Sequence, residues 1–416
     1  MSTRISAILV ASIIAAPLWA QDDALPSAGK TVPGMESYDR FIPAFLHKWQ
    51  LPGGSIAVAK NGRLLLARGY GWADVEAKKP VGPGSLFRIA SVSKPITAAA
   101  VLRLAEQQRL SLDDRAFDLL PKFRLPDGPG IDARLRTITV RQLLQHTAGW
   151  DRDKSFDPMF RPGIIAQATG TPSPATSEAI VRYMLRQPLD FSPGQRYAYS
   201  NFGYCLLGRV IEAITGKPYE EALRELVLAP CGIERMRLGR TRPGDRADAE
   251  VRYYHTVEGP TASVFPDVKE PVAWPDGGFY IEAMDAHGGW TASAADLVRF
   301  ASAVDGARPP ALLSPESVRL IATRPAPPVS QHQPTFYGLG WNIRPTAEGA
   351  NWWHTGSLPG TVTILVRTSD GRAWAALFNG RPRDDQLRPM QREIDELMWR
   401  AAGEVTHWPE HDLFEK

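Results

Sequence analysis

The chain has 416 residues, 44% of them hydrophobic, which is enough to form a large core in one big domain or two packed lobes. Charged residues make up 22% and the formal net charge is +3, so the composition favours neither a nucleic acid nor an anionic membrane as a partner. Two cysteines occur, Cys205 and Cys231. An exported chain could join them in a disulfide, and two small buried side chains are the alternative that spacing leaves open.

The first twenty residues, MSTRISAILVASIIAAPLWA, have the pattern of a secretory signal peptide. One arginine precedes an apolar run, and a small residue, Ala20, is followed by the polar QDD. The run is too short to span a bilayer comfortably, and no later stretch approaches the roughly 20 apolar residues of a transmembrane helix. The sequence therefore predicts a cleaved signal at 1–20 and a periplasmic or secreted protein without stable membrane insertion. An uncleaved membrane anchor is the alternative.

Two β-hairpins are predicted, one near each end of the chain. Each has a turn sequence between strand-like segments, Asn61-Gly62 in the first and Asp370-Gly371 in the second. The flanking segments are 55–60, 63–71, 361–367 and 373–380. A helix is predicted after the second hairpin, at 391–404, where apolar residues fall on one face. Strands from both ends of the chain are therefore expected.

Between the hairpins, apolar residues recur at helical spacing. The segments with this pattern are 91–108, 139–146, 177–187, 202–215 and 218–228. Proline, glycine and polar residues interrupt it in three stretches, 151–178, 257–278 and 323–335. Loops of this length often form lids or substrate walls, and plain surface connections are the alternative. We therefore expect a mainly helical segment inserted into a sheet domain.

Ser91 and Lys94 stand at the start of the first of these helices, in the stretch FRIASVSKP. Three positions apart on a helix, their side chains point the same way, so a hydroxyl and an amine can meet. A lysine whose pKa is lowered by burial can remove the proton of a serine alcohol, which makes Ser91 a candidate nucleophile. Ser-x-x-Lys alone is a weak signal, because a serine before a helix is usually an N-cap.

Two further polar groups lie at similar junctions, a Tyr-Ser-Asn before a helix and a His-Thr-Gly after a strand-like segment. Their residues are Tyr199, Ser200, Asn201, His354, Thr355 and Gly356. The glycine would let a substrate backbone approach closely. Each group also has a plain structural interpretation, with Ser200 or Asn201 as a helix cap and His354 as a strand-end side chain.

Taken together and in this order, the three motifs resemble those of the class C β-lactamase and serine DD-peptidase superfamily, the penicillin-binding-protein-like serine hydrolases. The resemblance runs from about residue 35 to 402. It implies an α/β fold of the α+β type: an antiparallel sheet built from both chain ends and flanked by helices, with a mainly helical lobe inserted. The active site is expected at the junction of the two lobes.

The resemblance also implies a domain division. A signal peptide at 1–20 and a flexible leader at 21–34 precede a single catalytic domain at 35–402, and a tail follows at 403–416. Within the domain, the sheet lobe is expected at about 35–88 and 288–402, and the helical lobe at about 89–287.

The resemblance assigns roles to the motif residues. Ser91 would be acylated, Lys94 would help to deprotonate it, and Tyr199 would relay protons; which of the last two is the base in each step stays open. The backbone amides of Ser91 and Ser357 would form an oxyanion hole. The implied substrate-binding residues are Asn201, which would contact the substrate amide, and His354, Thr355, Gly356 and Ser357.

Histidine at 354 departs from the lysine that class C β-lactamases usually carry at this position. A histidine is mostly neutral at pH 7, so it binds a substrate carboxylate less strongly than a lysine would. Efficient β-lactam turnover is therefore not expected. Four aromatic residues are candidates for an apolar acyl pocket, with a place in the core as the alternative: Tyr280, Trp290, Trp341 and Trp353.

The sequence thus predicts an exported serine hydrolase that cleaves an ester or amide bond through an acyl-enzyme, as a D-alanyl peptide carboxypeptidase, an esterase or a weak β-lactamase. The alternative is a non-catalytic or slowly acylated penicillin-binding-like sensor. The expected partner is a small-molecule or peptide substrate, with no cofactor and no metal. Among the eight histidines there is no His-Glu-x-x-His, and His146 and His287 are expected to be structural. The acyl donor and the oligomeric state are left open.

Overall fold

An antiparallel sheet lies at the centre of the computed structural model, which describes residues 25–125, 130–255 and 259–415. Within these residues nine strands form the sheet, in the order β1-β3-β2-β12-β11-β10-β9-β8, with β4 paired to β3. A smaller sheet has the order β5-β7-β6. The strands are β1 Ser27–Ala28, β2 Gly53–Lys60, β3 Arg63–Asp74, β4 Lys79–Pro80, β5 Phe87–Arg88, β6 Arg237–Leu238, β7 Trp290–Ala292, β8 Phe336–Tyr337, β9 Asn342–Thr346, β10 Gly349–Leu358, β11 Thr361–Arg367 and β12 Arg372–Phe378.

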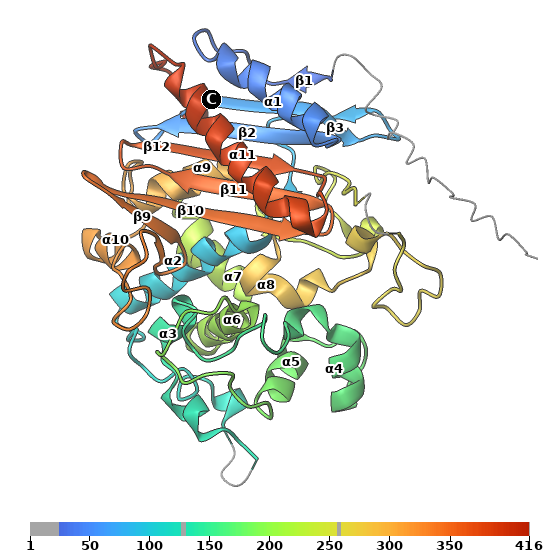
Figure 1. Ribbon diagram of the computed structural model, residues 1–416, viewed down its shortest axis with the longest axis vertical. Helices are drawn as coiled ribbons and strands as arrows, with labels where there is room; N and C mark the ends of the chain where they lie inside the picture. Colours follow the sequence, from blue (N-terminus) through green and yellow to red (C-terminus); the bar gives the residue numbers. More distant parts are fainter. Residues whose placement is uncertain (1–24, 126–129, 256–258, 416) are drawn as a thin grey trace, which may run out of the picture.

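Helices cover both faces of the large sheet (Figure 1). They are α1 Glu36–Lys48, α2 Ser93–Glu106, α3 Val140–Leu144, α4 Pro162–Thr169, α5 Ser177–Met184, α6 Asn201–Thr215, α7 Tyr219–Leu223, α8 Asp285–Gly288, α9 Ala294–Val304, α10 Pro315–Ile321 and α11 Asp384–Gly403. Helices α1 and α11 pack on one face, and α9 packs on the other. Helices α3 to α7 form a lobe beyond α2 and α8, and each face of the sheet buries its own apolar core.

Strands from the two chain ends meet in the middle of the sheet, where β2 pairs with β12 from Gly54–Phe378 to Lys60–Arg372. The predicted fold class is thereby confirmed. In the first predicted hairpin, Asn61 and Gly62 both have positive φ, 51° and 76°, the conformation of a two-residue turn that follows the twist of its strands. The second hairpin, β11 to β12, is also present.

Helix α6 shows how local sequence sets the element that follows the Tyr-Ser-Asn motif. The Ser200 hydroxyl accepts a hydrogen bond from the Gly203 amide at 3.2 Å and caps the helix, as one interpretation of the motif predicted. The helix ends at Gly216, whose φ of 71° suits a residue without a Cβ. Asn201 thus occupies the first helical position, directed toward the junction with α2.

The stretch 151–178 is more ordered than a plain loop, because it contains α4 and a 3₁₀ turn at Pro158–Phe160.

Cys205 and Cys231 are both free and buried, so they are two small buried side chains and not a disulfide. No helix among the described residues has the length and apolar character needed to cross a membrane. The predicted signal peptide at 1–20 lies outside the described residues.

Residues outside the predicted catalytic domain contact its sheet at both ends. Ser27–Ala28, in the predicted leader, pair with β3. In the predicted tail, the Asp412 carboxylate accepts from the Leu64 amide at 2.9 Å and from Arg308 at 2.7 Å. Both segments thus contact the sheet, and the division at 35 and 402 stays a prediction.

Candidate active site

Ser91 is held at the junction of the sheet and the helical lobe, in a 3₁₀ turn directly before α2. The preceding Ala90 has a φ of 48°, a left-handed conformation that is costly for a residue with a side chain. The backbone of Ile89, the residue before Ala90, is held by two hydrogen bonds. The Ile89 amide donates to the Trp290 carbonyl at 2.9 Å, and its carbonyl accepts from the Thr363 hydroxyl at 2.9 Å. The strained turn is thus supported by strands of both sheets, β7 and β11.

Lys94 is fully buried below Ser91, as the second residue of α2. Its Nζ lies 3.1 Å from Ser91 Oγ. The same nitrogen lies 2.8 Å from Asn201 Oδ1 and 2.8 Å from the His287 carbonyl oxygen. The structure therefore brings together the serine, the lysine and the asparagine of two separate motifs.

The lysine is placed to act as an uncharged amine. Burial lowers its pKa well below the usual value, and the positive charge of Arg152 lowers it further. A neutral amine has two N–H donors and one lone pair. Since Asn201 Oδ1 and the His287 carbonyl can only accept, the two N–H groups point to them. The lone pair is then left for the hydroxyl proton of Ser91.

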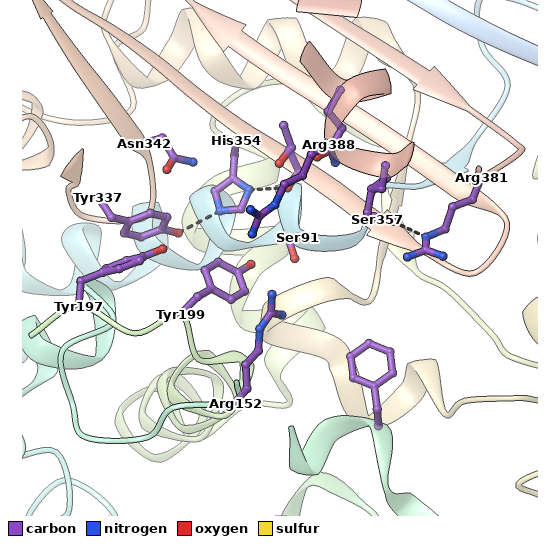
Figure 2. Close-up of a pocket in the computed structure, with 14 residues that line it drawn as sticks. Ser91, Arg152, Tyr197, Tyr199, Tyr337, Asn342, His354, Ser357, Arg381 and Arg388 are labelled. Atoms are coloured by element: carbon purple, nitrogen blue, oxygen red, sulfur yellow. Dashed lines mark hydrogen bonds between the residues drawn. The ribbon is translucent and has the colours of Figure 1, made fainter. Parts of the chain in front are cut away.

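Tyr199 lies beside the same serine, with its hydroxyl directed toward Ser91 (Figure 2). Lys94 Nζ is 4.8 Å and Arg152 Cζ is 4.7 Å from the centre of its ring. Burial raises the pKa of the phenol above its usual value, and the hydrogen bond with Ser91 opposes this only in part. Tyr199 is therefore a protonated donor at neutral pH.

A cavity of about 420 Å³ opens above Ser91 (Figure 2). Its lining is mostly polar and aromatic and includes three arginines but no aspartate or glutamate. The lining residues are Ser91, Arg152, Phe160, Tyr197, Tyr199, Tyr337, Asn342, His354, Thr355, Ser357, Arg381, Leu387, Arg388 and Gln391. The cavity thus favours negative charge in whatever it binds.

His354 reaches this cavity as a neutral ring. Its Nδ1 donates to the Thr355 carbonyl at 2.7 Å, because a carbonyl can only accept. Its Nε2 then accepts from the Tyr337 hydroxyl at 3.0 Å (Figure 2). Burial lowers the pKa of His354 to about 3. This agrees with the expectation of an uncharged histidine.

The other residues predicted to bind substrate divide into two groups. Thr355 and Ser357 line the cavity, and the Ser357 hydroxyl accepts from Arg381 Nε at 2.8 Å. Gly356 and Asn201 are not among the lining residues. Both ends of the Asn201 amide group are hydrogen-bonded within the protein, to Lys94 and to Asp157.

The structure gives Gly356 a second reason to lack a side chain, while the close approach of a substrate backbone stays a prediction. A Cβ at this position would lie 2.3 Å from the Ile89 carbonyl oxygen and 2.3 Å from Thr363 Oγ1. The absent side chain therefore makes room for the protein's own chain two residues before Ser91. Gly356 lets β10 pack against the turn that carries the serine.

Replacing Gly356 with alanine is expected to lower activity through this contact. The new methyl group must push β10 and the Ile89 backbone apart, which displaces Ser91 from the residues on β10. We expect a lower melting temperature, by several degrees, together with a lower kcat. Thermal unfolding and ester hydrolysis would be measured on the same preparation. An alanine variant with unchanged stability and kcat would contradict the packing role.

Several residues at the site were not identified from sequence, and some that were proposed lie elsewhere. Trp290 and Trp341 are buried in the core, and neither Tyr280 nor Trp353 lines the cavity. The residues missed by sequence reasoning are Arg152, Asp157, Phe160, Tyr197, Tyr337, Asn342, Arg381, Leu387, Arg388 and Gln391. The only signal for the first three was their place in the proline-rich stretch 151–178. No metal-binding cluster is found in the described part of the chain, and the buried His146 and His287 lie beside Lys94.

The sheet with its helical lobe, and the serine and lysine at their junction, define a β-lactamase-type serine hydrolase. The family model described as Beta-lactamase matches residues 38–397, and the chain belongs to that family. It is 26% identical over 385 residues to penicillin-binding protein 4* of Bacillus subtilis (strain 168), covering 87% of this chain and 74% of the relative.

Two further proteins show how far the similarity extends. Protein flp of Staphylococcus aureus (strain MW2) is 30% identical over 214 residues, which is 51% of this chain and 40% of the relative. The chain thus aligns with less than half the length of that protein. The D-amino acid amidase of Ochrobactrum anthropi SV3 superposes with a TM-score of 0.67 at 23% identity, covering 90% of this chain and 99% of the amidase, and shares the fold.

Proposed function

We propose that this protein is an exported serine hydrolase that cleaves an ester or amide bond through an acyl-enzyme on Ser91. The observation that carries the proposal is the buried Lys94 Nζ 3.1 Å from Ser91 Oγ, in a site where burial lowers the pKa of the lysine well below its usual value. A serine alcohol becomes an effective nucleophile when a neighbouring base takes its proton. The penicillin-binding protein and the amidase among the similar proteins support the same class of reaction.

The steps follow from the positions of three side chains. Ser91 Oγ attacks the carbonyl carbon of the substrate while its proton passes to Lys94 Nζ. Tyr199 donates its proton to the leaving group as the bond between that group and the carbonyl carbon breaks, and regains one from the protonated Lys94. A water molecule then attacks the acyl-enzyme and gives up a proton to Lys94, directly or through Tyr199 as a relay. That proton passes to Ser91 Oγ as the serine leaves as the free alcohol.

The charge of the cavity supports an acyl donor that carries a carboxylate. Arg152, Arg381 and Arg388 line the cavity, and His354 contributes no positive charge. Arg381 is oriented by Ser357 and by an ion pair with Asp384. Arg388 is exposed on α11 and extends into the cavity (Figure 2). Substrate carboxylates would thus be bound from α11 rather than from the His-Thr-Gly motif.

Arg388→Gln is expected to weaken hydrolysis of an anionic ester selectively. For a nitrophenyl ester of glutaric acid, which keeps one free carboxylate, we expect kcat/KM to fall about two- to fivefold. This is the effect expected from the loss of one exposed ion pair. The neutral nitrophenyl butyrate should be unaffected. Arg383→Gln is the matched control, because Arg383 is exposed just before the same helix but does not line the cavity. Equal effects of both variants on both esters would contradict the charge assignment.

The experiment that tests the proposed function is turnover of short-chain nitrophenyl esters, followed by D-alanyl peptides and penicillins. A hydrolase releases many nitrophenol molecules per protein molecule. A sensor of the penicillin-binding type would release about one, in a burst, and then stop. Release of none from any of these donors would count against the proposal.

A further inference from the structure

The carboxylate of Asp157 lies beneath the site and has no part in the steps proposed above. Its side chain is 15% exposed and precedes the 3₁₀ turn in the stretch 151–178. One oxygen, Oδ1, accepts from the Met159 amide at 3.1 Å. The other, Oδ2, accepts from Asn201 Nδ2 at 2.6 Å.

This contact decides which way the Asn201 amide group faces. An asparagine side chain can place either its oxygen or its NH₂ group toward a neighbour, and its partners determine the choice. A carboxylate only accepts, so the NH₂ group must face Asp157. The amide oxygen is then turned toward Lys94, where it lies 2.8 Å from Nζ.

We propose that Asp157 is a positioning residue of the hydrolase: through Asn201 it directs an N–H of Lys94 away from Ser91 and keeps the lysine lone pair for the serine proton. This inference rests on the proposed function, because it requires Lys94 to act as the base. The hydrogen bonds run in one direction, from Ser91 to Lys94, then to Asn201, then to Asp157. Reversing the hydrogen bond between Asn201 and Asp157 would therefore reverse the one between Lys94 and Asn201.

Asp157→Asn is the substitution that reverses it. The Met159 amide would hold the oxygen of the new side chain, as it holds Oδ1 now, so the turn keeps its cap. The new NH₂ group would face Asn201, which must rotate to present its oxygen. The NH₂ group of Asn201 would then donate to the lone pair of Lys94, and Ser91 would lose its proton acceptor.

The charges around Lys94 give the expected pH dependence a direction. Arg152 lowers the pKa of Lys94, and Asp157 raises it. Burial lowers the pKa of each neighbouring histidine and raises that of Tyr199, so these groups are uncharged near neutral pH. The histidines are His146, His287 and His354. Asp157 itself faces Arg152, whose Nη1 is 4.0 Å away, and Lys94. Removing the carboxylate charge therefore lowers the pKa of Lys94.

The test is the pH profile of kcat/KM for a neutral nitrophenyl ester. In Asp157→Asn we expect the plateau to fall about tenfold or more, because base catalysis contributes at least that much, and the acid limb to move to lower pH. Asp153→Asn is the matched control: it removes the same charge from the same stretch, 3.8 Å from Arg152, but its side chain is 90% exposed and does not line the cavity. That variant should keep the plateau.

A second variant separates orientation from simple loss of structure. In Asp157→Asn/Asn201→Asp the new carboxylate at 201 can only accept from Lys94, so the plateau should rise above that of the single variant. Its charge lies against Lys94, so the acid limb should move above the wild-type position. Both variants should unfold cooperatively on heating, which shows that they are folded.

The positioning role is overturned if Asp157→Asn has the profile of Asp153→Asn, or if the double variant shows no recovery and no upward shift. Failure of the proposed function has a different result. In that case the ester activity of the wild-type protein would survive in Ser91→Ala, whatever the behaviour of Asp157.

Discussion

Ser91→Ala is expected to abolish ester turnover, with a loss of kcat of roughly 10³-fold or more, because Ser91 carries the hydroxyl that is hydrogen-bonded to the buried lysine in the described structure. The loss should be of turnover rather than of binding, so that the substrate still protects the variant against thermal unfolding. The measurement is initial-rate release of nitrophenol over a range of ester concentrations.

Ser93→Ala is the control for this result. Ser93 is buried two positions along the chain, and its hydroxyl accepts from the Trp290 amide at 3.3 Å. Loss of that bond is expected to lower stability, since it leaves a buried amide unpaired, but turnover should persist. If Ser93→Ala abolished turnover and Ser91→Ala did not, the assignment of the nucleophile would be wrong.

Lys94→Met is expected to lower kcat by roughly 10²- to 10⁴-fold, the usual contribution of a general base. Methionine has nearly the shape of the lysine stem and needs no hydrogen bonds, so the core at α2 stays filled. Asn201 Oδ1 and the His287 carbonyl would lose a donor, which costs about 1–3 kcal/mol for each group left unpaired. The variant is therefore expected to be folded, less stable and nearly inactive.

The pH dependence of kcat/KM identifies Lys94 as the base. A protonated amine cannot accept the proton of Ser91, so kcat/KM should rise as pH increases through the pKa of Lys94. Because burial and Arg152 lower that pKa, the rise should lie well below the range of an ordinary lysine. The limb should be missing from the residual activity of Lys94→Met and unchanged in Lys122→Met, an exposed lysine paired with Glu178. A persistent limb in Lys94→Met would assign the titration to another group.

The elements that could be predicted from sequence are those whose signals are local. Asn61-Gly62 specifies a tight turn by itself, and the apolar period of α6 is intact. Two helices were missed or shortened because a proline interrupts their pattern. Helix α1 contains Pro43, and α11 contains Pro389 and begins at Asp384, before the predicted start at 391. Both helices gain stability from packing on the sheet and on each other.

The site was predictable where the chemistry lies within one motif, and not where it depends on contacts between distant segments. Ser91 and Lys94 are one helical turn apart, so their meeting follows from spacing. Asp157 is reached only through Asn201, from a stretch whose sequence resembles a loop. The reason for Gly356 also lies in another segment, the backbone at Ile89.

The most direct test of the central claim is the intact mass of the protein after rapid acid quenching during turnover of a nitrophenyl ester. We expect a species heavier by one acyl group, with the added mass on the peptide that contains Ser91, and no such species in Ser91→Ala. Turnover without any acylated protein, or acylation that persists in Ser91→Ala, would contradict an acyl-enzyme at Ser91.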